Sequence, residues 1–500
     1  LIRRLLENGA NSSFVHLLAD NNKSDSEILA DPVAASGKIF VRQAIPLPEN
    51  LYGSERKNSA GIDFGNEAEL TKLMSAVTPF AAKTTPPVKD ADKKTLDDAI
   101  ASAKKSFSEW AATATDARAK ILERAADLIE ENAHELIALC VREAGKTLPD
   151  SVSEIREVAD FCRYYAQQVL VISKPELMAG PVGESNVLSL HPRGVFACIS
   201  PWNFPLAIFM GQVVAALVTG NCVIAKPAEQ TPAIAARAVE ILYEAGIPKG
   251  VLHLVPGSGE TIGAALVSDK NIAGVVFTGS LATAQHIALS LAQRGGDIIP
   301  FIAETGGQNC MVVDSSALLE QAVDDIIISA FGSAGQRCSS LRVLYVQEDI
   351  AGELISLLAG AMQELKVGDP GEVDTDIGPV IDAQAQAMLT EHIETMKKSS
   401  KLQSVTPIPA GLNGFFVAPH AFEIEDISEL KREIFGPVLH IIRFKSGELE
   451  KVVDAVGSTG YGLTFGIHSR INDHINLLVS KVKAGNIYVN RSMIGATVGV

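Results

Sequence analysis

Cys338 is the residue whose surroundings best suit a nucleophilic thiol. It lies in SAGQRCSS, a small, polar, glycine-containing break after an apolar helical stretch that ends near Phe331. A thiol in such a loop can be reached by a substrate, and the adjacent Arg337 and backbone amides would lower its pKa. The same position also suits an inert buried thiol, so the local sequence leaves both interpretations open.

The other cysteines indicate core packing rather than chemistry. They lie in apolar strand or helix contexts, without a CxxC pair or a closely spaced histidine, at Cys140, Cys162, Cys198, Cys222 and Cys310. This pattern predicts neither a zinc cluster nor a disulfide framework. We therefore expect no metal site and a reducing, cytoplasmic location.

Two polar residues follow apolar stretches and have the chemistry to assist a thiol. Glu304, in IPFIAETGGQN, comes after an expected buried strand, where burial would favour the protonated form and suit a general base. Asn203 lies in the proline-bracketed turn ISPWNFP, where its amide can donate to a developing oxyanion. An Asx-turn that only stabilises the backbone explains Asn203 equally well.

A glycine-rich turn and a serine turn indicate a nucleotide site. Gly257 and Gly259, in HLVPGSGETIG, lie between a strand and a helix, where glycine lets a pyrophosphate approach the backbone. The spacing is not GxGxxG, so an ordinary strand-to-helix loop also fits. Ser280, in FTGS, begins the next helix and is also explained as an ordinary N-cap.

The strand CVIAK ends in a charged pair, Lys226 and Glu229. A carboxylate at the end of this strand can accept the ribose hydroxyls of a dinucleotide and would repel a 2′-phosphate. The pair therefore favours NAD over NADP. Taken alone, it also fits a solvated surface ion pair.

The elements that must position these residues alternate between strand and helix from Gly194 onward. Apolar, β-branched runs predict strands at VFACIS, CVIAK, VLHLV, AGVVF and DIIPFI, and helical spacing predicts helices over 205–219, 232–245, 259–267 and 281–294. Strands that are apolar throughout indicate a parallel sheet covered on both faces. The fold class is α/β, a doubly wound sheet with its ligand crevice at the strands' carboxyl ends.

The flanking regions are predicted more coarsely. Two amphipathic helices are expected between residues 92 and 139 and a third over 151–168, interrupted near Pro149. A second α/β block after Cys310 has expected strands at VLYVQ, IGPVI and LHIIRF and helices over 318–331 and 350–365. Residues 21–87 lack long periodic segments and are assigned to a connector and arm.

Composition excludes several classes of protein. The 500 residues are 47% hydrophobic and 20% charged, which predicts a globular chain of two to four domains at about 100–200 residues each. A net charge of −16 argues against nucleic acid as a partner. The longest apolar runs are shorter than the ~20 residues of a membrane span.

The opening LIRRLLEN has the pattern of a helix that began before the first residue, so we expect the chain to be part of a longer one.

Seven motifs in this order resemble the aldehyde dehydrogenase superfamily: PWNFP at 201–205, KPAE at 226–229, PGSG at 256–259, FTGS at 277–280, ETGGQN at 304–309, GQRC at 335–338 and EIFGP at 433–437. The resemblance implies that Cys338 is the nucleophile, Glu304 the general base and Asn203, with the Cys338 amide, the oxyanion hole. It also implies NAD as cofactor, held by the residues already singled out and by Trp202, Glu433 and Phe435.

The same resemblance implies the domain organisation. It predicts an NAD-binding domain over 88–305 with an oligomerisation flap at about 170–192, a catalytic α/β domain over 306–480, and the start of a truncated C-terminal substrate and oligomerisation segment over 481–500. A homo-oligomer is therefore expected.

Further similarities narrow the substrate. Ser339 and the late loop with Gly495 and Ala496 look like the branch that oxidises L-glutamate γ-semialdehyde, the open form of 1-pyrroline-5-carboxylate. Residues 1–20 resemble the last helix of a proline dehydrogenase barrel, with Arg3, Arg4 and Glu7 as its substrate-site residues, although an ordinary amphipathic helix also fits.

Together these features resemble the bifunctional proline utilization A family. In such a parent chain a proline dehydrogenase part is covalently linked, FAD belongs only to that missing part, and any peripheral membrane association runs through it. The alternatives are a dehydrogenase of another small semialdehyde, a CoA-acylating enzyme, which Glu304 argues against, and a non-catalytic protein, which the presence of Cys338, Glu304 and Asn203 together argues against.

Overall fold

The computed structural model describes residues 45–83 and 87–499, and the chain from Pro48 onward forms one compact unit. The expected barrel tail with Arg3, Arg4 and Glu7 lies outside the described residues. In the described part of the chain, no helix combines the length and the apolar character needed to cross a membrane.

Among the residues that the structure describes, five α-helices precede the first large sheet: α5 (Glu67–Ala81), α6 (Lys93–Ala112), α7 (Thr115–Glu131), α8 (Ala133–Ala144) and α9 (Leu148–Ile172). Helix α5 was not expected in the arm; Asn66 caps it, and Leu73 and Val77 are its buried residues. The interruption expected near Pro149 is wrong. This proline lies in the first turn of α9, where its missing N–H would have no partner within the helix.

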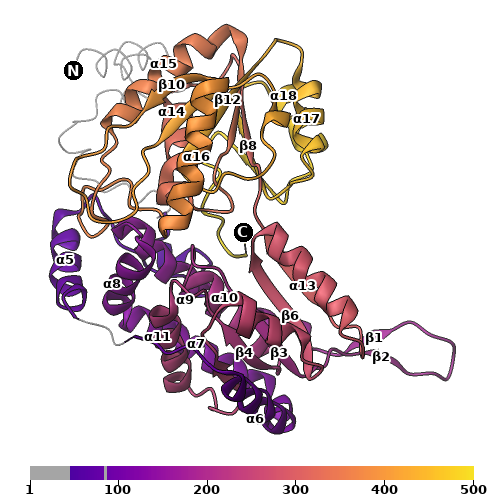
Figure 1. The fold of residues 1–500 in the computed structure, drawn as a ribbon. Coiled ribbons are helices and arrows are strands. Elements are labelled where there is room, and N and C mark those ends of the chain that lie inside the picture. The colour runs from indigo at the N-terminus through magenta and orange to yellow at the C-terminus, as the bar shows by residue number, and fades with distance from the viewer. Residues whose placement is uncertain (1–44, 84–86, 500) are drawn as a thin grey trace, which may run out of the picture. The chain divides into compact units, whose positions relative to one another are not determined.

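The predicted doubly wound sheet is present (Figure 1). Its five strands are parallel and lie in the order β5-β4-β3-β6-β7. They are β3 (Val195–Ile199), β4 (Cys222–Lys226), β5 (Leu252–Leu254), β6 (Ile272–Gly279) and β7 (Phe301–Thr305). The chain order reverses between β3 and β6, so a ligand crevice is expected at the carboxyl ends of these two strands.

Four helical segments connect the strands: α10 (Ala207–Val218), α11 (Pro232–Ala245), the one-turn π-helix η2 (Gly259–Gly263) with α12 (Ala264–Ser268), and α13 (Leu281–Gln293). Helix α10 packs on β3 and β4 and also against α9, so the sheet has a second helical layer on that side. The strands β3 and β4 are buried along their whole length, as their apolar sequences predict.

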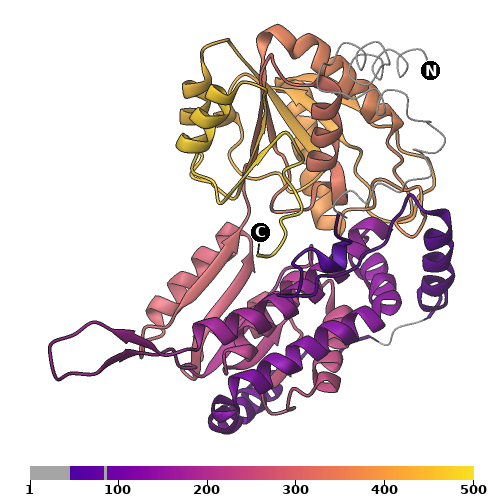
Figure 2. The same cartoon turned by 180° about the vertical axis from the view of Figure 1, so that it is seen from behind.

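Strand β7 departs from the expected burial. It lies at the edge of the sheet, α13 packs against it, and Ile302, Ala303 and Glu304 are exposed. An edge strand has one neighbour instead of two, so an apolar sequence does not guarantee that both of its faces are covered. The expected flap is an antiparallel hairpin of β1 (Glu176–Met178) and β2 (Asn186–Leu188), which projects away from this sheet (Figures 1 and 2).

The second sheet has seven strands in the order β10-β11-β12-β9-β8-β13-β14, with β10 antiparallel to its neighbour. They are β8 (Cys310–Val313), β9 (Val343–Gln347), β10 (Lys401–Val405), β11 (His420–Glu423), β12 (Val438–Phe444), β13 (Thr464–His468) and β14 (Asn486–Val489). Its helices are α14 (Leu319–Phe331), α15 (Glu348–Glu364), α16 (Ala383–Ser399), α17 (Leu449–Ser458) and α18 (Asn472–Lys481).

One expectation for this half is wrong. IGPVI is not a strand, because Ile377 makes only an isolated bridge to Val367. The expected C-terminal segment begins with β14, which pairs in parallel with β13 at the edge of the second sheet. Separate hydrophobic cores underlie the two sheets, the first ending at Ile287 and the second beginning at Cys310.

Candidate functional site

Cys338 lies where two pockets meet. The first pocket, of about 330 Å³, is lined by residues that follow β3 and β6 and by the loop after residue 432, including Trp202, Asn203, Ser280, Glu433 and Phe435. The second, of about 520 Å³, is lined mainly by apolar residues of α9, α10 and β7, including Phe161, Tyr165, Ile208, Ile302 and Glu304. Cys338 and Thr305 line both pockets. A thiol in this position can face one ligand on each side.

An unusual backbone turn delivers the thiol to this junction. Between α14 and β9, the short helix η3 (Gly332–Gly335) places Ser333, Ala334 and Gly335 in succession at φ values of 57°, 53° and 65°. Left-handed conformations cost non-glycine residues about 1–2 kcal/mol each. A Cβ on Gly335 would lie 2.3 Å from the carbonyl oxygen of Gly436, so glycine is required for the close approach of these two loops.

Side-chain amides hold the nucleophile loop. Asn203 Nδ2 donates to the carbonyl oxygen of Gln336 at 3.0 Å, so Asn203 lies beside the cysteine loop. Asn309 Nδ2 donates to the carbonyl oxygens of Cys338 at 2.6 Å and Ser340 at 3.0 Å. Asn309 belongs to the ETGGQN motif, but the motif by itself predicts no role for this residue. Its position directly before a buried strand was the available signal.

The ionisation of Cys338 differs from the expectation. Burial, followed by the negative charge of Glu433, raises the pKa of the thiol to about 11, and the nearby Arg342 only partly opposes this shift. The expected effect of Arg337 is absent because its guanidinium pairs with the buried Asp150 instead. The thiol is therefore the resting form at neutral pH, and attack on a substrate requires loss of its proton.

The raised pKa gives a testable pH dependence. With a pKa of about 11, the thiolate is a small fraction near neutrality and grows about tenfold with each pH unit, so alkylation of Cys338 by iodoacetamide should accelerate steadily from pH 7 to pH 10. The measurement is the labelling rate of the Cys338 peptide by mass spectrometry. A rate that levels off below pH 8 would contradict the assignment of a neutral resting thiol.

Glu304 and Cys338 line the same pocket, but Glu304 is not buried as expected. It lies near the end of β7, where the edge strand leaves the carboxylate open to water. A solvated carboxylate in the same pocket as the thiol can receive a proton from a water molecule that enters this pocket.

The first pocket has the shape and chemistry for a nicotinamide ring and its ribose. Trp202 and Phe435 meet edge to face with ring centroids 5.6 Å apart. Glu433 is largely buried at the pocket wall, and that burial raises the pKa of its carboxyl group. A Cβ on Gly306 would overlap the Glu433 carboxylate, so the glycine makes room for it. A cavity lined by apolar residues and one carboxylate can receive an aromatic ring and accept sugar hydroxyls.

The glycine-rich turn after β5 needs its first glycine to fold. Gly257 has φ +147°, and a Cβ there would lie 2.6 Å from a side-chain atom of Ile262, so its requirement for glycine comes from the fold itself. The N–H of Gly259 donates to Glu229 Oε1 at 2.5 Å, and Lys226 Nζ lies 3.2 Å from the same oxygen. Ser280 caps α13 through the N–H of Thr283 and also lines the first pocket. The charged pair and the turn thus form one connected cluster at the carboxyl end of β4.

Glu229 is expected to set the choice between NAD and NADP. A 2′-phosphate within a few ångströms of this carboxylate meets a repulsion on the order of 1 kcal/mol, about fivefold in relative kcat/KM. Glu229→Ser should narrow the preference for NAD by about that factor, measured as the ratio of kcat/KM for the two cofactors. Equal use of both cofactors by the unaltered protein would refute the assignment.

The three residues expected at the far end of the substrate are not brought together around either pocket. Ser339 is half-buried, and its carbonyl oxygen accepts a hydrogen bond from the Thr464 hydroxyl at 3.2 Å. Gly495 and Ala496 are exposed, and Gly495 has φ +75°. None of the three is among the residues that line the two pockets.

Glu157 is a further candidate site residue, which none of the sequence motifs singles out. It lies on α9 one turn before Phe161 and two turns before Tyr165, so the three share the face that lines the second pocket. Its charge acts on the Cys338 thiol, and burial, together with the neighbouring Glu154, raises the pKa of the Glu157 carboxyl group to about 7. An acidic residue on the apolar face of a helix was the signal that could have found it.

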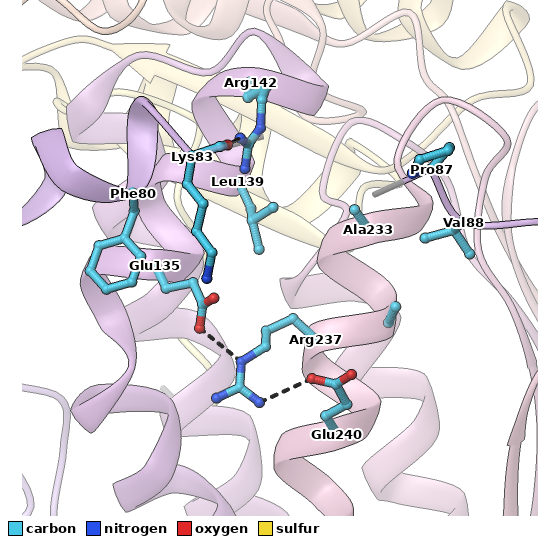
Figure 3. Close-up of a pocket in the computed structure, with 11 residues that line it drawn as sticks. Phe80, Lys83, Pro87, Val88, Glu135, Leu139, Arg142, Ala233, Arg237 and Glu240 are labelled. Carbon is cyan, nitrogen blue, oxygen red and sulfur yellow. Dashed lines mark hydrogen bonds and ion pairs between the residues drawn. The ribbon is translucent and has the colours of Figure 1, made fainter. Parts of the chain in front are cut away.

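Another cavity, of about 360 Å³, lies between α5, α8 and α11 (Figure 3). Its charged residues are largely engaged with one another: Arg237 lies 2.8 Å from Glu135 and 3.3 Å from Glu240. Arg142 donates to the carbonyl oxygen of Lys83. No predicted site residue lines this cavity, so the junction at Cys338 is the better candidate for chemistry.

The chain is similar to known proteins over most of its length. The sequence model of the aldehyde dehydrogenase family matches residues 66–499. The bifunctional protein PutA of Klebsiella aerogenes is 45% identical, in a match that covers 100% of this chain and 41% of that protein. The chain thus spans less than half the length of this curated relative.

Two solved structures are also similar. A crystal structure of a bifunctional proline utilization A protein has 51% sequence identity and a TM-score of 0.92, and the match covers 100% of this chain and 51% of that one. A 1-pyrroline-5-carboxylate dehydrogenase from Thermus with bound NAD has 31% identity and a TM-score of 0.83, with coverage of 89% and 92%.

Proposed function

Since the chain belongs to the aldehyde dehydrogenase family, we propose that it oxidises L-glutamate γ-semialdehyde, the open form of 1-pyrroline-5-carboxylate, to L-glutamate with NAD. The observation that carries the proposal is the place of Cys338, at the junction of a pocket suited to nicotinamide and a second pocket with a carboxylate. The similarity to a 1-pyrroline-5-carboxylate dehydrogenase with bound NAD supports both the cofactor and the substrate.

The first half of the reaction forms a covalent bond to the thiol. Cys338 gives its proton to a water molecule in the second pocket, its sulfur adds to the aldehyde carbon, and the carbonyl electron pair moves onto oxygen. An amide has two N–H donors, so Asn203 can keep its bond to the Gln336 carbonyl and direct the other N–H at the oxyanion. NAD, when bound, supplies the acceptor for the hydride that leaves the aldehyde carbon.

The second half of the reaction releases the acid. Loss of hydride leaves a thioester on Cys338, and Glu304, in the same pocket, takes a proton from water as the water adds to the acyl carbon. The C–S bond then breaks, glutamate leaves and the thiol is restored. Glu304 is exposed to solvent, which suits this step because a water molecule must reach its carboxylate.

Glu157 and Ser339 are the candidates for recognising the amino acid end of the substrate. That end carries an ammonium and a carboxylate several bonds from the aldehyde. Glu157 shares the pocket-lining face of α9 and offers the ammonium a counter-charge. Ser339 directly follows the nucleophile, and its hydroxyl and the backbone amides of Gly495 and Ala496 are the donors proposed for the carboxylate, although none of the three lines either pocket.

Ser339→Ala is expected to lower kcat/KM only for aldehydes that carry a carboxylate. Loss of a hydrogen bond to a charged group costs roughly 1.5–3 kcal/mol, so kcat/KM for glutamate semialdehyde should fall about ten- to a hundredfold. Propanal lacks the carboxylate and should be oxidised almost as before. If both substrates are affected equally, Ser339 supports Cys338 and does not select the substrate.

The test of the proposed function is NADH absorbance after addition of 1-pyrroline-5-carboxylate, with and without CoA. We expect NADH and free glutamate without CoA. A requirement for CoA would favour acyl transfer, and preference for another small semialdehyde would overturn the substrate. Binding of NAD without any turnover would favour a non-catalytic protein with this fold.

The proposal also covers the linked enzyme part, the location in the cell and the oligomeric state. The bifunctional relative supports a covalently linked proline dehydrogenase part that supplies the semialdehyde, with FAD confined to that part. We place the enzyme in the cytoplasm as a homo-oligomer, because all six cysteines are free thiols and the β1–β2 hairpin exposes Leu177, Val187 and Leu188.

A further inference from the structure

We propose that Arg342 is a positioning residue that ties the nucleophile loop to the nicotinamide-ribose loop, so that thiol and cofactor are held in one geometry. The proposal rests on the proposed function, because it takes Glu433 and Phe435 as cofactor contacts. Arg342 lies just before β9 and is buried, with only 1% of its surface exposed. A fully buried guanidinium is costly unless its donors are used, so its partners indicate its role.

One side of the guanidinium holds the nucleophile loop. Nη1 donates to the carbonyl oxygen of Gly335 at 2.6 Å, and Nη2 donates to that of Arg337 at 3.0 Å. These carbonyls belong to the left-handed turn and to the residue directly before Cys338. The two bonds therefore stabilise the strained backbone that presents the thiol.

The other side holds the loop at 433–437. Nη1 also donates to the carbonyl oxygen of Gly436 at 3.2 Å, and Nη2 lies 3.3 Å from Glu433 Oε1. The guanidinium carbon lies 5.2 Å from the ring centroid of Phe435. The planar guanidinium points its N–H donors at both loops at once, an arrangement called here the fork. The ammonium group of a lysine cannot reproduce this fork.

The charge of Arg342 reaches the thiol as well. Three charged groups act on Cys338: Glu433 and Glu157 oppose ionisation of the thiol, and Arg342 favours it. The same guanidinium thus orients the carboxylate that would bind the ribose and offsets the charge of that carboxylate at the sulfur. Removing Arg342 should therefore weaken cofactor binding and hinder ionisation of the thiol together.

Two variants separate the fork from the charge. Arg342→Met removes both the fork and the charge, so the Kd for NAD should rise roughly ten- to a hundredfold. The pH dependence of the alkylation rate of Cys338 by iodoacetamide should also move to higher pH. Arg342→Lys keeps the charge without the fork, so NAD binding should weaken while the alkylation profile stays near that of the unaltered protein. Both readouts use the enzyme without substrate, with NAD binding followed by calorimetry.

Arg118→Met is the matched control. Arg118 is also a buried arginine that donates to backbone carbonyls, including that of Val218 at 2.9 Å, and it touches neither loop. Its loss should lower the melting temperature without changing the Kd for NAD or the alkylation profile. If Arg342→Met behaves in the same way, the role of Arg342 is only structural and the proposal is wrong.

The remaining outcomes also decide the question. A change in only one readout for Arg342→Met contradicts a bridge between the loops, because the bridge predicts both. If that variant does not fold, Arg342→Lys decides alone, and an unchanged Kd for NAD overturns the proposal. Failure of the unaltered protein to bind NAD would instead refute the proposed function, so the two failures are distinguishable.

Discussion

Replacing Cys338 with alanine is expected to abolish NADH formation and leave NAD binding nearly intact. The thiol forms the only covalent bond to the substrate in the proposed mechanism, so its loss should lower kcat by at least about a thousandfold. The first pocket keeps the residues proposed to contact the cofactor, including Trp202, Glu433 and Phe435, so the Kd for NAD should change little. The measurements are NADH absorbance with 1-pyrroline-5-carboxylate and calorimetric titration with NAD.

Cys222→Ala is the control for this variant. Cys222 is a buried free cysteine at the start of β4, the end of the strand opposite the proposed crevice. Its replacement should leave turnover in place. Substantial residual turnover by Cys338→Ala would refute the nucleophile assignment, and loss of NAD binding would show that the thiol supports the cofactor pocket.

Glu304→Gln is expected to produce about one NADH per site and then stall. Hydride leaves the aldehyde carbon before water is needed, so the first half of the reaction proceeds without the base. Hydrolysis then fails and the thioester remains on Cys338. Rapid mixing should show a burst, and mass spectrometry should show the added acyl group on the cysteine peptide.

A glutamate far from this chemistry serves as the control. Glu109 is an exposed residue of α6, and Glu109→Gln should keep steady turnover without a burst. Steady turnover by Glu304→Gln would remove Glu304 from deacylation. Absence of both burst and turnover would instead move its role to the step that deprotonates the thiol.

The expected strands of the first sheet could be read from local pattern, because β3 and β4 are buried along their length and must be apolar throughout. Strand β7 has the same kind of sequence but lies at the edge. Whether a neighbour covers a strand depends on sheet order, which short-range periodicity does not encode.

The residue types of the site and their order could be predicted without a structure. Cys338, Glu304 and Asn203 stand in motifs whose spacing identifies the family, and the alternation of strand and helix puts Asn203 at the carboxyl end of a strand. These features are local, so they depend on neighbours along the chain.

The electrostatics of the site and the contacts between its loops could not be predicted from neighbours along the chain. Arg337 precedes the nucleophile but pairs with Asp150, whereas Arg342 reaches back to both loops and lies close enough to act on the thiol. Burial raises the pKa of Cys338 to about 11, against the expectation from its polar neighbours in sequence. Charge and desolvation act through space, so they depend on groups that are far apart in the chain and meet only when it folds.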